Sequence, residues 1–171
     1  ADTVDISSHI PMGDTPTGII RSPFLGADGD FEIATNHHLL ELRIIEPGMA
    51  ILEGSRSFGD FDDSLGDILA AVEQYDMNEF VSGEGEIEGL LLLLQQSPGM
   101  LVAVQRRPEG EDDEVLGSLD LSAWLGGDLA YGLAVDHQSK EVLIAAVSGG
   151  APYDRVIRLR INWYGTSGPS A

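Results

Sequence analysis

Short apolar runs follow one another about every ten residues along most of this chain, and they constrain its fold more than any other feature. Clusters of Gly, Pro and Asp separate the runs, which is typical of short β-strands joined by tight turns. Residues 46–48, 97–99 and 137–140 predict hairpin turns, so we expect antiparallel pairing. The predicted strands are residues 18–21, 31–34, 39–45, 50–53, 87–95, 100–106, 116–123, 129–135, 142–146 and 155–164.

One segment departs from the strand pattern. Within residues 60–75 the apolar side chains fall at helical spacing, and Asp and Ser residues just before them can cap a first turn. These apolar residues are Leu65, Ile68, Leu69 and Val72. We therefore predict an all-β fold, a jelly-roll-like antiparallel β-sandwich or barrel, with one inserted helix near residues 62–75.

The first 17 residues differ in composition from the rest of the chain. They contain two Pro, several Ser and Thr, and no sustained hydrophobic period. We expect residues 1–17 to form an extended arm that either lies free or grips a neighbouring molecule. Residues 18–171 then form a single β-sandwich domain, which is the expected arrangement for a chain of this length.

Five successive leucines occupy positions 90–94. Because side chains alternate between the two faces of a strand, both faces of this one are apolar and both need a cover of protein. A two-sheet sandwich covers only one face. The second face must then be covered by the helix, by a loop or by another subunit.

The charge is strongly acidic for a chain with a core. There are 9 basic and 29 acidic residues, a net charge of −20, although 43% of the residues are hydrophobic. An acidic disordered tail would have fewer apolar residues. Only Lys140 accompanies eight arginines, and repulsion among the acids is screened in about 1 M salt, where the Debye length is about 3 Å. We interpret this as a halophilic protein that needs molar salt to fold and, lacking a basic stripe, does not bind nucleic acid.

The last predicted strand, residues 155–164, holds a group of the scarce arginines. In strand geometry Arg158 and Arg160 share one face, while Ile157 and Leu159 point to the other. Two alternatives follow for the arginines. They pair with acids on an adjacent strand of the same chain, or they contact an acidic patch on a neighbouring copy.

The strongest metal-like pattern lies in residues 36–48 and resembles the first motif of cupin enzymes. In that motif two histidines stand one residue apart before a glutamate and a glycine; here Glu41 and Gly48 have suitable spacing, and His37 and His38 stand near the place of the histidines. However, the two histidines are adjacent, so on a strand they point to opposite faces and cannot share one ion without a bulge. We expect both to be surface or interface residues.

The other sequence patterns that could indicate a catalytic or binding site are weak. The acidic residues in 26–32 and 59–67 lack the spacing of a calcium loop, and His137 falls in a predicted turn. The sequence has no nucleophile elbow and no phosphate-binding loop. Without cysteine it has no disulfide, thiolate metal site or thiol nucleophile. We therefore expect no enzyme, and no catalytic, cofactor-binding or metal-binding residues.

The chain resembles the small single-jelly-roll major capsid proteins of icosahedral, membrane-containing viruses of halophilic archaea. The likeness rests on the size, the short strands, the single helix expected in DSLGDILAAVEQY, the arm, and the preference for Arg over Lys. It implies a virion subunit that assembles with copies of itself and with a related, larger capsid protein, over an inner viral membrane. No small-molecule substrate is implied. The alternative is a cupin-like metal enzyme or a carbohydrate-binding module in the cytoplasm of a halophilic archaeon.

Overall fold

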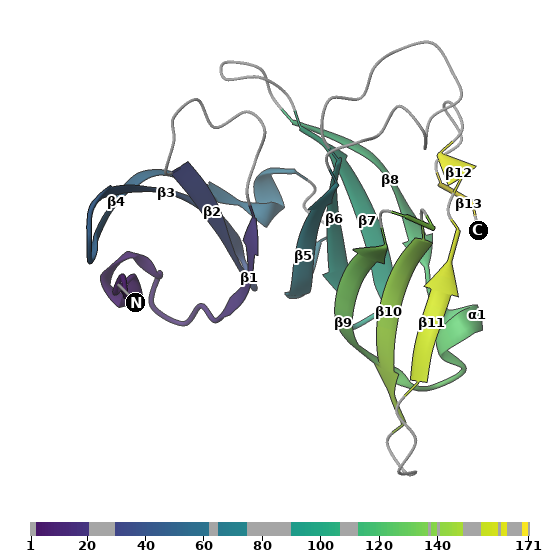
Figure 1. Ribbon diagram of the computed structural model, residues 1–171. Coiled ribbons are helices and arrows are strands. Elements are labelled where there is room, and N and C mark those ends of the chain that lie inside the picture. Colours follow the sequence, from purple (N-terminus) through teal and green to yellow (C-terminus); the bar gives the residue numbers. More distant parts are fainter. Residues whose placement is uncertain are drawn as a thin grey trace.

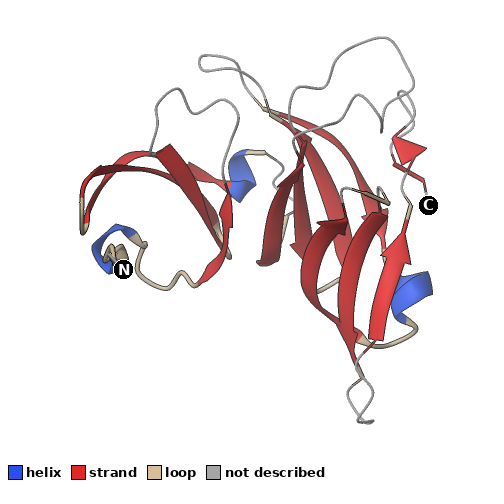
Figure 2. Ribbon diagram, viewed as in Figure 1, coloured by secondary structure: helices blue, strands red, loops and turns tan. Residues whose placement is uncertain are grey.

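The computed structural model describes residues 3–20, 30–61, 65–74, 90–106, 113–136, 138–139, 141–148, 155–160, 162–163 and 169–170. These residues form three antiparallel sheets of three or four strands and one small two-stranded ribbon (Figure 1). Strands dominate, and the helical pieces are short (Figure 2). The prediction of an all-β, sandwich-like fold is confirmed.

The first sheet contains β1 (Pro16–Ile20), β2 (Asp30–Thr35), β3 (His38–Glu46) and β4 (Met49–Ser57), in that order. The predicted hairpin at residues 46–48 joins β3 to β4. Gly48 in this turn has a φ of 85°, a left-handed conformation that favours glycine. A short 3-10 helix (Phe58–Asp60) follows β4.

The second and third sheets lie further along the chain. The second contains β5 (Ile68–Gln74), β6 (Leu90–Gln95), β7 (Met100–Gln105) and β8 (Glu114–Asp120). Helix α1 (Ser122–Leu125) leads to the third, in which β10 (Glu141–Val147) lies between β9 (Leu129–Asp136) and β11 (Arg155–Leu159). The ribbon pairs β12 (Asn162–Trp163) with β13 (Pro169–Ser170).

Three predicted elements are wrong, and one of them is the last strand, residues 155–164, where the structure has β11 and β12 in different sheets. Residues 68–74 form strand β5 rather than part of a helix, because the free edge of β6 takes them as an antiparallel neighbour, with Val72 opposite Leu92. The strand predicted to run to residue 123 ends at Asp120, and helix α1 begins at Ser122. Predicted helix residues 62–64 and 75, and predicted strand residues 21, 87–89, 161 and 164, lie outside the described residues.

The connections within the sheets are simple. Every hydrogen-bonded pair of strands in the described sheets is also a pair of sequence neighbours. A jelly roll instead contains Greek-key crossings that pair strands distant in sequence. The described strands therefore form meanders, and the sandwich is reached without the jelly-roll connectivity that was expected.

The leucine strand β6 lies in the middle of three stacked sheets. Leu90, Leu92 and Leu94 pack into one hydrophobic core with residues of the third sheet. Leu91 and Leu93 point the other way, into a core with residues of the first sheet. The chain therefore covers both faces of β6 itself, but it uses a whole sheet instead of the expected helix, loop or neighbouring subunit.

The amino-terminal arm packs on the outer face of the first sheet. Its described part contains a 3-10 helix (Ser7–His9), and its apolar side chains Val4, Ile6 and Ile10 contact a third core around Leu40 and Leu42. Figure 1 shows the arm curling inside the concave side of this sheet. In this structure the arm covers its own chain.

We expect Leu91→Ala and Leu92→Ala each to lower the free energy of unfolding by about 2–5 kcal/mol, because each opens a cavity in a different fully buried core. Urea unfolding in about 2 M NaCl measures the effect. Met12→Ala, at an exposed position of the arm, is the control and should change stability by about 0.5 kcal/mol or less. A loss at Leu91 no larger than that of the control would contradict a covering first sheet.

Candidate functional site

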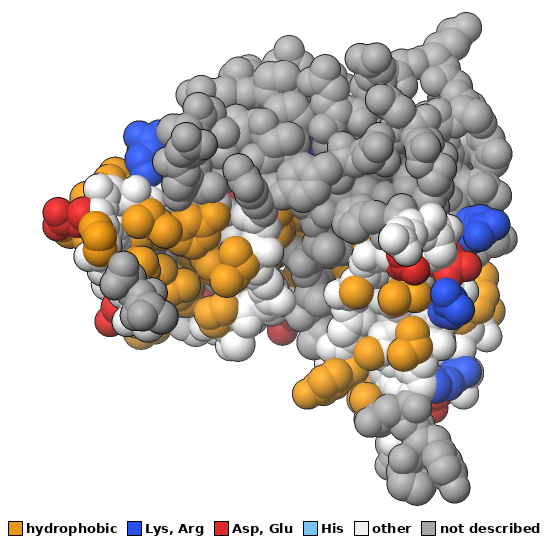
Figure 3. All heavy atoms as spheres, in the orientation of Figure 1, with side chains coloured by type: hydrophobic (Ala, Val, Ile, Leu, Met, Phe, Trp, Pro, Cys, Tyr) orange, Lys and Arg blue, Asp and Glu red, His pale blue; other side chains and the backbone are white. Residues whose placement is uncertain are grey.

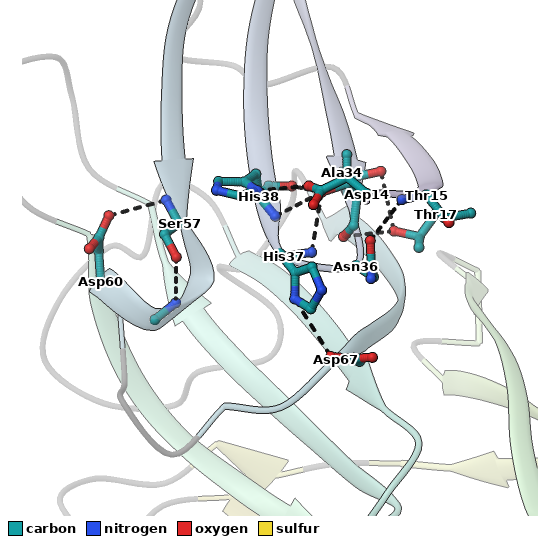
Figure 4. A network of polar contacts seen from close by, with 12 residues as sticks. Asp14, Thr15, Thr17, Ala34, Asn36, His37, His38, Ser57, Asp60 and Asp67 are labelled. Carbon is teal, nitrogen blue, oxygen red and sulfur yellow. Dashed lines mark hydrogen bonds and ion pairs between the residues drawn. The ribbon is translucent and has the colours of Figure 1, made fainter. Parts of the chain in front are cut away.

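A network of polar contacts joins the arm to the first sheet (Figure 4). Asp14, at the end of the arm, accepts hydrogen bonds through Oδ2 from Nδ1 of His38, at 2.7 Å, and from Oγ1 of Thr35, at 2.6 Å. The Thr35 hydroxyl also accepts a bond from the backbone N–H of His38 at 2.8 Å. These contacts pin the arm to the turn between β2 and β3, and we call the three residues the arm latch.

The environment of Asp14 keeps its carboxyl group ionised. Burial raises the pKa of Asp14, but hydrogen bonds from Thr35 and His38, together with the nearby histidine charges, outweigh burial and leave this pKa below its usual value. Because a carboxylate is only an acceptor, Nδ1 of His38 carries the proton in this contact. An aspartate that fixes the tautomer of a histidine also orients general bases in enzymes. Here the pair joins the arm to the first sheet, because Asp14 belongs to the arm and His38 begins β3.

A buried ionic cluster joins the first sheet to the second. Arg106 donates to both carboxylate oxygens of Glu32, at 2.8 and 2.9 Å, and each residue is only 4% exposed. Asp113, whose side chain is fully buried, lies 3.2 Å from Nε of Arg106 and 2.7 Å from Nη1 of Arg56. Two guanidinium groups thus neutralise two carboxylates; the side chains of Glu32, Arg106 and Asp113 are buried, and that of Arg56 is 46% exposed. We call these four residues the buried ionic cluster.

The arginines of the last strand pair within the chain. Arg158 lies 2.8 Å from Glu141 on the neighbouring strand β10, and Arg160 lies 3.7 Å from the same carboxylate. Arg155 contacts Asp128 at 2.7 Å and also donates to the carbonyl groups of helix α1. The alternative of pairing with acids of the same chain is therefore confirmed.

The outer face of the third sheet is apolar and exposed. The side chains that alternate with its core residues include Ala134, Leu143 and Ala145, and three larger ones are strongly exposed. These are Leu129 at 54%, Tyr131 at 68% and Val156 at 61%. Figure 3 shows hydrophobic side chains gathered over this sheet, with charged side chains at the margin. We call this surface the outer sheet face.

A second exposed apolar surface lies at the end of the β3–β4 hairpin, on the opposite side of the molecule in Figure 1. Among the described strands β4 lies at an edge of its sheet, and edge strands can pair with another chain. We call this surface the hairpin end. Its members are Ile44, Ile45, Met49, Ile51 and Leu52.

The structure separates the residues of the cupin-like pattern. His37 faces Asp67 at 3.5 Å, whereas His38 contacts Asp14. In the part of the chain that the structure describes, no group of three or more His, Asp or Glu residues is arranged to hold a metal ion. Gly48 forms the β3–β4 turn, Glu41 lies on β3, and His137 lies outside the described residues.

The acidic segments take structural roles where they are described. In residues 26–32 only positions 30–32 are described, and Glu32 belongs to the buried ionic cluster. In residues 59–67, Asp60 accepts the backbone N–H of Ser57 and caps the 3-10 helix. Asp67 lies beside His37. These carboxylates stabilise local structure and interlayer contacts.

Comparisons with known proteins do not identify a family for this chain. The chain matches no family model, and comparison with curated proteins and with solved structures finds no similar protein. None of the described helices is long and apolar enough to cross a membrane. The two exposed apolar surfaces, the arm latch and the buried ionic cluster are therefore the features from which a function has to be argued.

Sequence reasoning missed the arm latch and the buried ionic cluster. Thr35 and the backbone of His38 are three positions apart after a strand, which is a Thr-turn pattern that could have been noticed. Asp14 gave no signal, because its partner His38 lies 24 positions away. Glu32 and Arg106 are 74 positions apart, and only the stacking of two sheets brings them together.

We expect Thr35→Val to lower the free energy of unfolding by about 1.5–3 kcal/mol at neutral pH, because it removes a donor to an ionised carboxylate. Asp14 has a lowered pKa, so its contribution is present above the pKa of the unfolded chain and is lost as pH falls through the folded value. The difference from the parent should therefore shrink as the pH falls below about 4. Urea unfolding across this pH range measures it.

Thr35→Ser is the matched control, since it keeps the hydroxyl group and should retain most of the stability. Limited proteolysis supplies a second readout, because a loosened arm is cut sooner than the sheets. If the Val and Ser variants unfold and are cut alike, Thr35 does not hold the arm through its hydroxyl group.

We expect Glu32→Leu to lower stability by about 3–5 kcal/mol, because it leaves the buried charge of Arg106 poorly compensated. The double variant Glu32→Leu/Arg106→Met should lose less than the sum of the two single variants, since it removes both charges of one pair. Urea unfolding of all four proteins in about 2 M NaCl gives the coupling energy. Additive losses would argue against a direct tie between the two sheets.

Proposed function

We propose that this chain is a structural subunit of the virion shell of a halophilic virus, which assembles with copies of itself and with a related capsid protein. The observation that carries the proposal is the pair of separate apolar surfaces, the outer sheet face and the hairpin end. A subunit of a closed shell must contact neighbours through more than one surface, and large exposed apolar patches on a small protein commonly mark such contacts.

The charge supports the same proposal. A net charge of −20 on 171 residues opposes close packing of copies in dilute buffer. In about 1 M salt the Debye length falls to about 3 Å, so copies can approach and apolar contact can hold them. Salt also strengthens the burial of apolar surface, which favours assembly further.

Because the described strands form meanders, the fold connectivity does not support the capsid proposal. The resemblance to single-jelly-roll capsid proteins included an expected fold connectivity and an inserted helix, and neither is found among the described strands. The composition and the exposed surfaces remain as support. The cupin-like alternative gains no observation of its own, since the histidines of residues 36–48 are divided between two aspartates.

We expect the purified chain to associate beyond a monomer in about 2 M NaCl, and to dissociate and loosen in about 20 mM NaCl, because repulsion returns as screening is lost. Light scattering measures the mass, and circular dichroism measures the fold. Sucrose at low salt is the control, since it favours compact states without screening charge. Immunogold labelling of native particles tests the virion directly.

A strict monomer in about 2 M NaCl, at every concentration reached, would overturn the assembly proposal. Unchanged circular dichroism at both salt concentrations would overturn its halophilic part. Labelling that is absent from regular particles of the native source would exclude a virion subunit even if the chain associates.

A further inference from the structure

We propose that a second copy of this chain packs on the outer sheet face, with β11 of each copy lying over β9 of the other. The inference rests on the proposed function, because it names the surface and the partner of one contact in the assembly. It assigns the contact to a two-fold arrangement in which the same face of each copy is used.

The shape and chemistry of the face suit sheet-on-sheet packing. The inward side chains of β10, Val142, Ile144 and Ala146, are buried in the core, so the alternate residues Leu143 and Ala145 look outward. The small Ala145 lies at the centre of this face, between the projecting Leu129 and Tyr131 on one margin and Val156 on the other. Two such faces can interlock as the two sheets of a sandwich do.

The charges on this face select another copy as the partner. At the end of this face that holds Asp136 and Glu141, these two carboxylates and two arginines, Arg158 and Arg160, cancel formally. At the other end Arg155 pairs with Asp128. The whole chain carries −20, so a strongly acidic partner meets less repulsion here than the average surface would impose. A basic partner would be attracted more strongly to the rest of the surface, which is acidic, than to this face.

The arrangement of these charges fixes the orientation. On β10, Leu143 pairs with Arg158 of β11 on one side and with Ala134 of β9 on the other, while Glu141 pairs with Asp136 of β9. The arginines and Asp136 therefore occupy opposite margins of the same end of the sheet. A two-fold axis parallel to the strands brings the arginines of each copy over Asp136 of the other. An axis across the strands would instead place β11 over β11 of the other copy in the reverse direction, with the arginines over the opposite end of that strand and away from Asp136.

The arginines retain donors for this second contact. Although both reach Glu141, the side chains of Arg158 and Arg160 are 63% and 70% exposed. A guanidinium group carries five N–H donors and can bind a second carboxylate while it keeps the first. The same axis places Val156 of one copy over β9 of the other, near Tyr131.

Charged substitutions at exposed positions test the surface. Sedimentation in about 2 M NaCl should show association weakened at least about tenfold by Tyr131→Glu and by Val156→Glu, because each buries a charge in an apolar contact. Met12→Glu, at an exposed position of the arm outside both apolar surfaces, is the matched control and should leave association unchanged. Circular dichroism checks that each variant folds.

Cross-linking tests the orientation, since the chain has no cysteine of its own. A mixture of Val156→Cys and Tyr131→Cys proteins, treated with a short bifunctional thiol reagent, should form cross-linked pairs in high yield. Val156→Cys alone should not, because the two copies of that residue lie on opposite margins. Equal yields from the mixture and from Val156→Cys alone would overturn the two-fold arrangement.

The outcomes separate this inference from the proposed function. A parent chain that never associates overturns both. A parent chain that associates, with Tyr131→Glu and Val156→Glu associating equally well, overturns only the assignment of the outer sheet face and leaves assembly through other surfaces standing.

Discussion

Two-sided burial of the leucine strand is the constraint on which the rest of this structure depends. Five leucines in a row cannot face water on either side, so β6 needs a sheet above it and a sheet below it. The third sheet covers one face and the first sheet covers the other. The first sheet then has an outer apolar face of its own, around Leu40 and Leu42, which the arm covers. Each layer exists because the previous layer leaves apolar surface open.

The few arginines of this chain lie where its layers and strands meet. Each described arginine pairs with a carboxylate from another strand or loop, and Arg106 does so in the buried space between the first and second sheets. Burial of ions is costly unless they are paired, so this cluster favours one register of the two sheets over others. An excess of acids at the surface and balanced charge within the stack can coexist, because salt screens the former and has little access to the latter.

The sequence predicted local structure better than it predicted contacts. Ten of the thirteen described strands were predicted because alternation and turn residues are local signals, and Gly48 marks its hairpin directly. Strand β5 was missed because Leu65, Ile68, Leu69 and Val72 also fit a helix, and pairing with β6 overrode that spacing. The second cover of β6 was recognised as a need, but not as a sheet. Glu32 and Arg106 could not be paired in advance, since many carboxylates compete for each arginine.

The meander order has a consequence for synthesis. Each sheet is built from consecutive strands, so each can close soon after its own residues emerge, with little loop entropy lost. The first sheet can cover one face of the leucine strand early in synthesis. The other face stays exposed to solvent until residues 129–159, which form the third sheet, have been made. Between those moments a nascent chain would present Leu90, Leu92 and Leu94 to its surroundings, where exposed apolar surface favours association with other chains. The rate at which the third sheet is synthesised and folds, rather than the free energy of unfolding of the finished protein, then decides how much newly made protein aggregates.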